Sequence, residues 1–95
     1  MVKSNPYQET LVSSGRTVTV IRKFSEYVNT EELKWHWDEE DRMVHKVHES
    51  DWEIQLDNEL PKRIKSTITI PKRTWHRLIK GTGDLCVIVE KIKDI

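Results

Sequence analysis

The chain has 95 residues, 34% of them charged and 36% hydrophobic, and its 16 basic and 16 acidic residues leave no formal net charge. This length fits one domain with one modest core, and the lack of a basic excess argues against nucleic acid as a partner. The single cysteine, Cys86, excludes an internal disulfide, no apolar run approaches the roughly 20 residues of a membrane span, and no hydrophobic stretch follows Met1, so we expect a cytoplasmic protein with no membrane partner.

The first third of the chain is predicted to hold an arm, a strand and a connection. Residues 1–15 are polar and rich in turn residues, which indicates an N-terminal arm with a short strand around residues 9–12. The stretch 16–24 is β-branched and nearly alternating, so it predicts the first strand of a single domain that spans residues 16–95. The polar residues 25–32 predict a connection that holds one helical turn.

Short apolar or alternating stretches bounded by turn residues predict six further strands, at 33–37, 42–48, 52–57, 66–70, 75–80 and 85–92, with a loop over 58–65. The stretch 52–57 alternates most cleanly between apolar and polar residues. The stretch 85–92 is apolar on both faces, so we expect one face in the core and the other buried in a homodimer. Because no segment keeps a helical period, the chain is predicted to be all-β, a sandwich or barrel.

Two segments each place a histidine beside tryptophans, 35–42 (WHWDEEDR) and 70–77 (IPKRTWHR). On a strand, residues i and i+2 face the same side, so His36 and Asp38 can point into one space. If the chain folds back to bring His76 opposite them, two imidazoles and a carboxylate converge. This set can hold a divalent metal with open coordination positions. The alternative is that carboxylates satisfy both histidines with no metal.

These segments resemble the two motifs of the cupin superfamily, HXH(X)3–4E and PXG(X)2H. His36 matches the first histidine of the first motif, while Asp38 stands at the second histidine and Arg42 at the glutamate. In the second motif His76 keeps the spacing from the proline, and Arg73 stands where glycine is usual. More narrowly, the chain is similar to small cupin-like proteins of marine bacteria and phages, with a W-H-x-D-x-x-D-R stretch and a later P-x-x-x-x-H-R.

The resemblance covers about residues 16–92 and implies a small cupin-type β-barrel, a jelly-roll-like double-stranded β-helix of antiparallel strands. It also implies a divalent metal, Fe, Mn, Ni or Zn, held by His36, His76 and Asp38, with Asp41 as the alternative carboxylate. No nucleotide cofactor is expected, because the glycine turn near residue 82 leads into a strand rather than a helix. If Arg42 points inward, it can pair with Asp38 and replace the metal; if it points outward, the three ligands remain.

Three functions stay open at this point. The first is a metal-dependent enzyme of the dioxygenase, isomerase or lyase type, or a metal-binding protein, that acts on a small organic acid or sugar. Arg42 and Arg77 are then the candidates to orient a carboxylate by bidentate hydrogen bonds. The second is a metal-free protein that binds a small molecule. The third is a homodimeric interaction module without catalysis.

Overall fold

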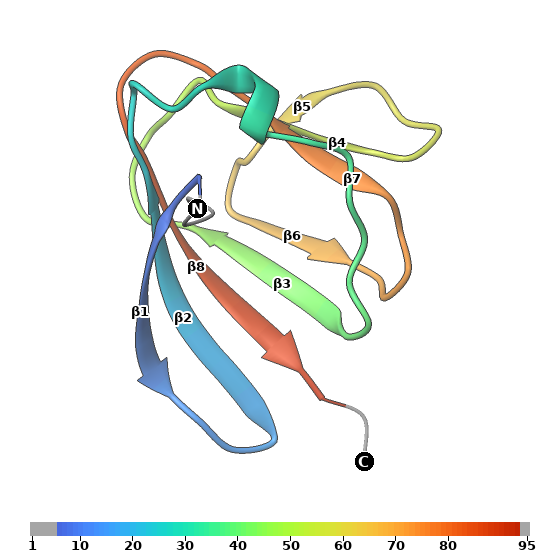
Figure 1. Cartoon of the computed structure of the whole chain (residues 1–95). Coiled ribbons are helices and arrows are strands. Elements are labelled where there is room, and N and C mark those ends of the chain that lie inside the picture. Colours follow the sequence, from blue (N-terminus) through green and yellow to red (C-terminus); the bar gives the residue numbers. More distant parts are fainter. Residues whose placement is uncertain (1–5, 94–95) are drawn as a thin grey trace, which may run out of the picture.

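The computed structural model describes residues 6–93, which form eight strands and one turn of 3-10 helix (Figure 1). Their bounds are β1 (Gln8–Ser13), β2 (Thr17–Phe24), η1 (Thr30–Glu32), β3 (Asp41–Lys46), β4 (Glu53–Leu56), β5 (Lys62–Arg63), β6 (Thr67–Ile70), β7 (His76–Ile79) and β8 (Leu85–Ile92). No helix in the described part of the chain has the length and apolar character needed to cross a membrane.

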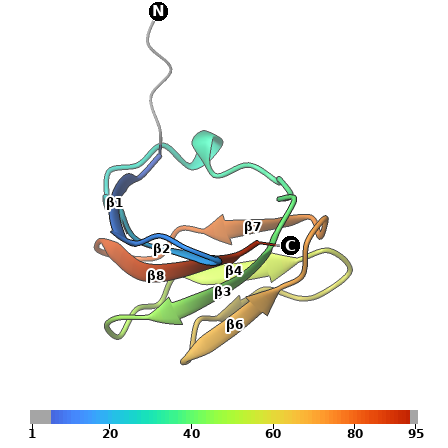
Figure 2. The same ribbon diagram turned by 90° about the horizontal axis from the view of Figure 1, so that it is seen from below.

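The strands form two antiparallel sheets. The larger has the order β1-β2-β8-β3-β6, and the smaller has the order β5-β4-β7. Figure 2 shows the segment between β2 and β3, which carries η1, arching away from the sheets before it returns to β3. This segment contains the first of the two histidine motifs, so its path determines where the candidate ligands lie.

One core lies between the inner faces of the sheets, and the alternation of apolar residues explains it. The cleanest predicted alternation is confirmed, since Trp52, Ile54 and Leu56 are all buried and Trp52 has no exposed surface. The Trp52 ring packs on Phe24 with centroids 5.8 Å apart, and its Nε1–H donates to the carbonyl oxygen of Gly83 at 3.0 Å. A buried indole therefore has both its apolar contacts and its hydrogen bond.

Strand β8 has the bounds that the sequence predicts and sits at the centre of the larger sheet. Its inward residues, Leu85, Val87 and Val89, are buried in the core. The opposite face, which includes Ile88 and Ile92, is half-buried. Of the two apolar faces of β8, one therefore lies in the core and the other lies on the outer face of the larger sheet.

The predicted strand over 33–37 does not form, and only His36 makes a bridge to the smaller sheet. Past His36 the opposite residues precede β7, which begins at His76, and they follow Pro71 and turn at Lys72 and Arg73. The proline has no N–H for a ladder, and Arg73 has a φ of 60°. An extended partner is therefore missing on one side of the bridge.

Smaller differences lie at three other places. The predicted loop over 58–65 contains the two-residue strand β5, and β3 ends at Lys46, before residues 47 and 48. The short strand expected near residues 9–12 is β1. It pairs with β2, and the register of this pairing shifts at a bulge between Leu11 and Ser13. Residues 1–5 of the expected arm lie outside the described residues.

Candidate metal centre

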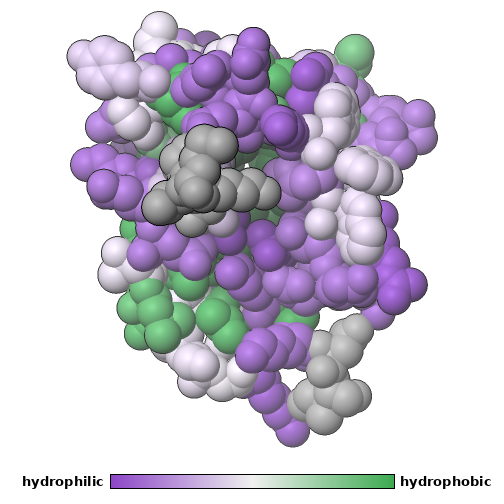
Figure 3. All heavy atoms as spheres, viewed as in Figure 1, coloured by the Kyte–Doolittle hydropathy of each residue, from purple (hydrophilic) through white to green (hydrophobic). Residues whose placement is uncertain are grey.

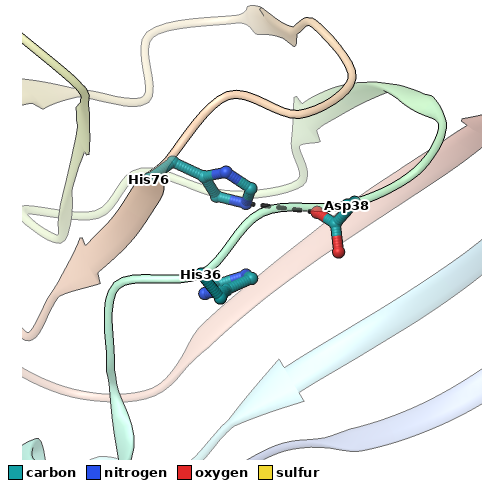
Figure 4. Close-up of side chains that lie close together, drawn as sticks. All are labelled: His36, Asp38 and His76. Carbon is teal, nitrogen blue, oxygen red and sulfur yellow. Dashed lines mark ion pairs between the residues drawn. The ribbon is translucent and has the colours of Figure 1, made fainter.

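The backbone brings the two histidines together. The N–H of His36 donates to the carbonyl oxygen of His76 at 3.0 Å, and the reverse bond measures 2.8 Å. Residues directly opposite in an antiparallel pair have side chains on the same face. The two imidazole centroids are accordingly 4.3 Å apart, and both rings turn toward Asp38 (Figure 4).

The turn before β7 fixes the carboxylate. The N–H of Arg73 donates to the carbonyl oxygen of Asp38 at 2.7 Å, and the N–H of Lys72 donates to Oδ1 of Asp41 at 2.8 Å. Asp38 is therefore held by its backbone, and this turn does not use its carboxylate. Asp41, the alternative ligand, uses its carboxylate to hold the turn and does not belong to the cluster of ligand atoms.

The cluster consists of one nitrogen from His36, one nitrogen from His76 and one carboxylate oxygen from Asp38, all within 4.8 Å of one another. Each histidine is oriented by a backbone carbonyl two residues earlier: Nδ1 of His36 lies 2.9 Å from the oxygen of Lys34, and Nδ1 of His76 lies 2.8 Å from that of Thr74. We assign the proton to Nδ1 in both rings, because a carbonyl can only accept. The lone pairs of both Nε2 atoms then face Asp38, which is the orientation that metal-ligating histidines adopt.

A cation fits the space between these atoms. Nε2 of His76 and Oδ2 of Asp38 lie 3.4 Å apart, and Oδ2 is buried without a hydrogen-bond donor among the described residues. Two acceptors that face each other repel unless a proton or a metal ion lies between them. Two ligands bonded to one tetrahedral ion at about 2.1 Å lie roughly 3.4 Å apart. This separation therefore suits a shared ion, with a small contraction of the cluster around it.

Burial and charge also favour ligand forms of these groups. Partial burial of the ring is the main cause that lowers the pKa of His36, and the nearby His76 and the charge of Arg42 add to it. Burial alone would raise the pKa of Asp38, but the nearby His76 and the charge of Arg42 outweigh that effect and lower it. A neutral imidazole and an ionised carboxylate are the forms that bind metals.

Arg42 points inward. Its Nη2 lies 3.2 Å from Oδ1 of Asp38 and 3.0 Å from Oε1 of Glu40, and its side chain is only 12% exposed. The arginine thus takes one oxygen of Asp38, while the other oxygen faces the histidines. Arg42 and the three-ligand set occupy the same cavity together, so an inward arginine leaves the metal-facing oxygen in place.

The three candidate ligands are among the residues that line a cavity of about 490 Å³. Apolar side chains from both sheets line much of its wall, among them Val44, Ile54, Ile70 and Leu78. Tyr7, Arg22, Glu32 and Lys34 also line it, and the sequence reasoning did not assign them to the site. The sequence does contain a signal for Arg22 as a cavity residue. It falls on the inward face of β2 between Val20 and Phe24, where a charged side chain is unusual.

Arg77 lies outside this cavity. Its Nε donates to Oε1 of Gln55 at 3.0 Å, and its guanidinium lies 4.8 Å from the ring centroid of Trp35. Trp35, Trp37 and Trp75 are 39%, 42% and 47% exposed, so only Trp52 is a core tryptophan. Alternation explains this, since residues beside His36 and His76 face away from the cavity.

Comparisons with known proteins bear on the fold. No protein-family model and no curated protein matches the sequence. KdgF from Halomonas sp. matches with a TM-score of 0.74 at 18% identity, over 99% of this chain and 86% of KdgF. An RmlC-like cupin with a double-stranded β-helix fold, from Methanocaldococcus jannaschii, matches with a TM-score of 0.71 at 7% identity, over 95% of this chain and 83% of that protein.

A third similar structure is the Fe(II) form of HppE, with a TM-score of 0.69 at 15% identity over 90% of this chain. The match covers 50% of HppE, so this chain spans about half of its length. The fold is therefore a small antiparallel double-stranded β-helix of the cupin type, which confirms the sequence-based prediction.

Proposed function

We propose that this cupin-fold protein holds a divalent metal ion on His36, Asp38 and His76 and that it binds or acts on a small molecule in the adjoining cavity. The observation that supports this most is the 3.4 Å separation of Nε2 of His76 and Oδ2 of Asp38, which are both acceptors when Nδ1 of His76 carries the proton. The likeness to HppE, which has been solved with Fe(II) and with Co(II) and substrate, is consistent with this proposal.

The residues of the chain have distinct roles in this function. The two histidines and one carboxylate would leave open coordination positions on the side of the cavity, and a bound ion would there supply a Lewis acid. The carbonyls of Lys34 and Thr74 hold the imidazoles in the ligating tautomer. Arg42 fixes the carboxylate by its ion pair with Oδ1, and the apolar wall would contact the carbon skeleton of the ligand.

Metal analysis of the purified protein tests the proposal. We expect up to one equivalent of Fe, Mn, Ni or Zn, or uptake of one equivalent of added Co(II), with a higher unfolding temperature. His76→Ala should lose both. His45→Gln is the matched control, because His45 lies outside the cavity and contacts Thr67 and Glu90. Absence of metal uptake and of stabilisation in the wild type would rule out the metal centre.

The ion pair between Arg42 and Asp38 favours a second candidate, a metal-free protein that binds a small molecule in the same cavity. In that case a proton on Nε2 of His76 satisfies Oδ2 of Asp38. Thermal unfolding separates the two candidates. Stabilisation by small molecules and by no metal supports the second, whereas stabilisation by a stoichiometric metal supports the first.

We further propose that the chain acts as a cytoplasmic homodimer. The outer face of the larger sheet carries the half-buried Ile21, Ile88 and Ile92. Figure 3 shows hydrophobic side chains gathered over β1 and β2 on an otherwise hydrophilic face, and Leu11 and Val12 of the edge strand β1 are exposed. Sedimentation should show a dimer for the wild type and a monomer for Ile88→Lys. A monomeric wild type would contradict the proposal.

A further inference from the structure

Two buried side-chain atoms of the described residues lack hydrogen-bond partners, and both belong to the candidate metal centre. One is the acceptor Oδ2 of Asp38, and the other is the donor Nε–H of Arg42. An unpaired buried polar atom costs stability, so native proteins rarely keep one without a reason. The acceptor is accounted for by a cation. The donor needs an acceptor that the described part of the chain does not provide.

The position of Arg42 shows where that acceptor can come from. Its Nη2 is used by Asp38 at 3.2 Å and by Glu40 at 3.0 Å, which anchors one corner of the guanidinium. The side chain borders the cavity, so a small shift brings its unpaired Nε–H to a ligand there. Both parallel edges of the guanidinium include Nη2, so a ligand carboxylate accepts one charge-assisted bond from Nε–H rather than a pair of bonds.

The charges around the cavity favour the same sign of ligand. Three basic residues, Arg22, Lys34 and Arg42, line it, against the acidic Glu32 and Asp38. Glu9 and Glu40 also pair with Arg22 and Arg42, so the protein groups alone carry no positive excess. A divalent ion on the histidines would add two positive charges and make the sum positive. Positive charge in a partly enclosed, largely apolar space attracts an anion, because such a space screens charge less than bulk water does.

We propose that the cavity binds a small organic carboxylate beside the metal, with Arg42 as its binding residue. This inference rests on the proposed metal centre and names the substrate class of that site. The carboxylate pairs with the guanidinium, and its carbon skeleton lies against the apolar wall formed by residues such as Ile54 and Leu78. Each ligand then balances the charge of the other, so carboxylate and metal bind with positive and reciprocal coupling.

Succinate and succinamide are suitable probes, because they share a carbon skeleton and differ in charge. Calorimetric titration of Co(II)-loaded wild type should show saturable binding of succinate, at least about tenfold tighter than that of succinamide. Succinate should also strengthen Co(II) binding by the same factor by which Co(II) strengthens succinate binding. The visible absorption of Co(II) provides a second signal that does not depend on activity.

Arg42→Gln tests the assigned residue, and Arg77→Gln is its matched control, because Arg77 stacks on Trp35 outside the cavity. We expect Arg42→Gln to weaken succinate binding at least about tenfold and Arg77→Gln to leave it unchanged. Arg42→Lys keeps the charge without the planar donors and should fall between them. Co(II) binding, measured alone in each variant, shows whether the metal centre has survived the change.

The outcomes are distinct. Equal binding of succinate and succinamide by the wild type, or unchanged succinate binding by Arg42→Gln, would overturn the inference. If Arg42→Gln fails to fold, the comparison of the two probes on the wild type decides alone. If the wild type takes up no Co(II) but binds succinate through Arg42, the metal centre is wrong and the carboxylate site stands.

Discussion

His36 and His76 lie 40 residues apart in the sequence, yet each donates its backbone N–H to the carbonyl oxygen of the other, at 3.0 and 2.8 Å. This bridge is the geometric basis of the candidate site. Because opposite residues of an antiparallel pair share a face, one backbone contact places both imidazoles side by side in the lining of the cavity. The neighbouring tryptophans, Trp35 and Trp75, face the other way and are exposed.

Asp38→Asn is expected to weaken the metal centre more than it weakens the fold. The amide keeps the shape but removes the one anionic ligand and the ion pair with Arg42, which lies 3.2 Å away. Affinity for Co(II) should fall more than about tenfold, and the metal-free protein should lose about 1–3 kcal/mol of unfolding free energy. Calorimetric titration and urea unfolding measure the two effects. Glu39→Gln, an exposed neighbour, should change neither, and unaltered affinity in Asp38→Asn would argue against the ligand role.

Arg73→Gly is expected to stabilise the turn that holds Asp38. Arg73 has a φ of 60°, in the left-handed region that costs a side-chain-bearing residue about 1–2 kcal/mol. Part of this gain is offset by the larger entropy of glycine in the unfolded chain, so we expect a net increase of about 0.5–1 kcal/mol. Arg73→Ala keeps the Cβ and should show no gain. Equal urea midpoints for the two variants would exclude backbone strain as the cause.

Gly81→Ala is expected to destabilise the fold by about 1–3 kcal/mol through overpacking. A Cβ at this position would clash with Oδ1 of Asp51 and would lie 2.7 Å from the backbone nitrogen of Trp52. Trp52 is fully buried in the core, so this backbone has little room to move. Gly15→Ala is the control, because its Cβ would meet nothing within 4 Å. Urea unfolding should show the loss in Gly81→Ala alone. Similar midpoints for both variants would mean that the backbone moves aside at little cost.

Asp51 is expected to make the free energy of unfolding depend on pH in the acid range. The N–H of Thr82 donates to its Oδ1 at 2.8 Å and the hydroxyl of Thr82 to its Oδ2 at 2.9 Å, and these bonds lower the pKa of Asp51 in the folded state. A lowered folded pKa contributes stability above the unfolded pKa of about 4, and this contribution is lost as the pH falls through the folded value. The difference in unfolding free energy between wild type and Asp51→Asn should therefore shrink between pH 7 and acid pH. A constant difference would show that the charge of Asp51 plays no part.

The strands that the sequence predicts well are those whose burial follows from local alternation. Trp52, Ile54 and Leu56 are buried as their spacing indicates, and β8 has its predicted bounds because both of its faces are covered or half-covered. The convergence of His36, Asp38 and His76 also agrees with the expectation. Its cause differs, however, since Asp38 is placed by the N–H of Arg73 and not by a regular strand.

The features that the sequence leaves open depend on contacts between distant segments. Arg42 turns inward because β3 places it on the face of the buried Val44, but its partners Asp38 and Glu40 lie on a non-regular segment with no periodicity to orient them. Arg22 points to the cavity because it lies on the inward face of β2 with Val20 and Phe24, but its partner Glu9, 2.7 Å away, lies on β1, in a part of the chain that reads as an arm. The ion pairs themselves are set by the tertiary structure and carry no local signal.

Anomalous diffraction from crystals grown with Co(II) tests the central claim most directly. The account predicts one anomalous peak between Nε2 of His36, Nε2 of His76 and Oδ2 of Asp38, with Arg42 still in contact with Oδ1. A structure with saturating Co(II), no peak at this position and the Nε2–H of His76 donating directly to Asp38 would contradict it.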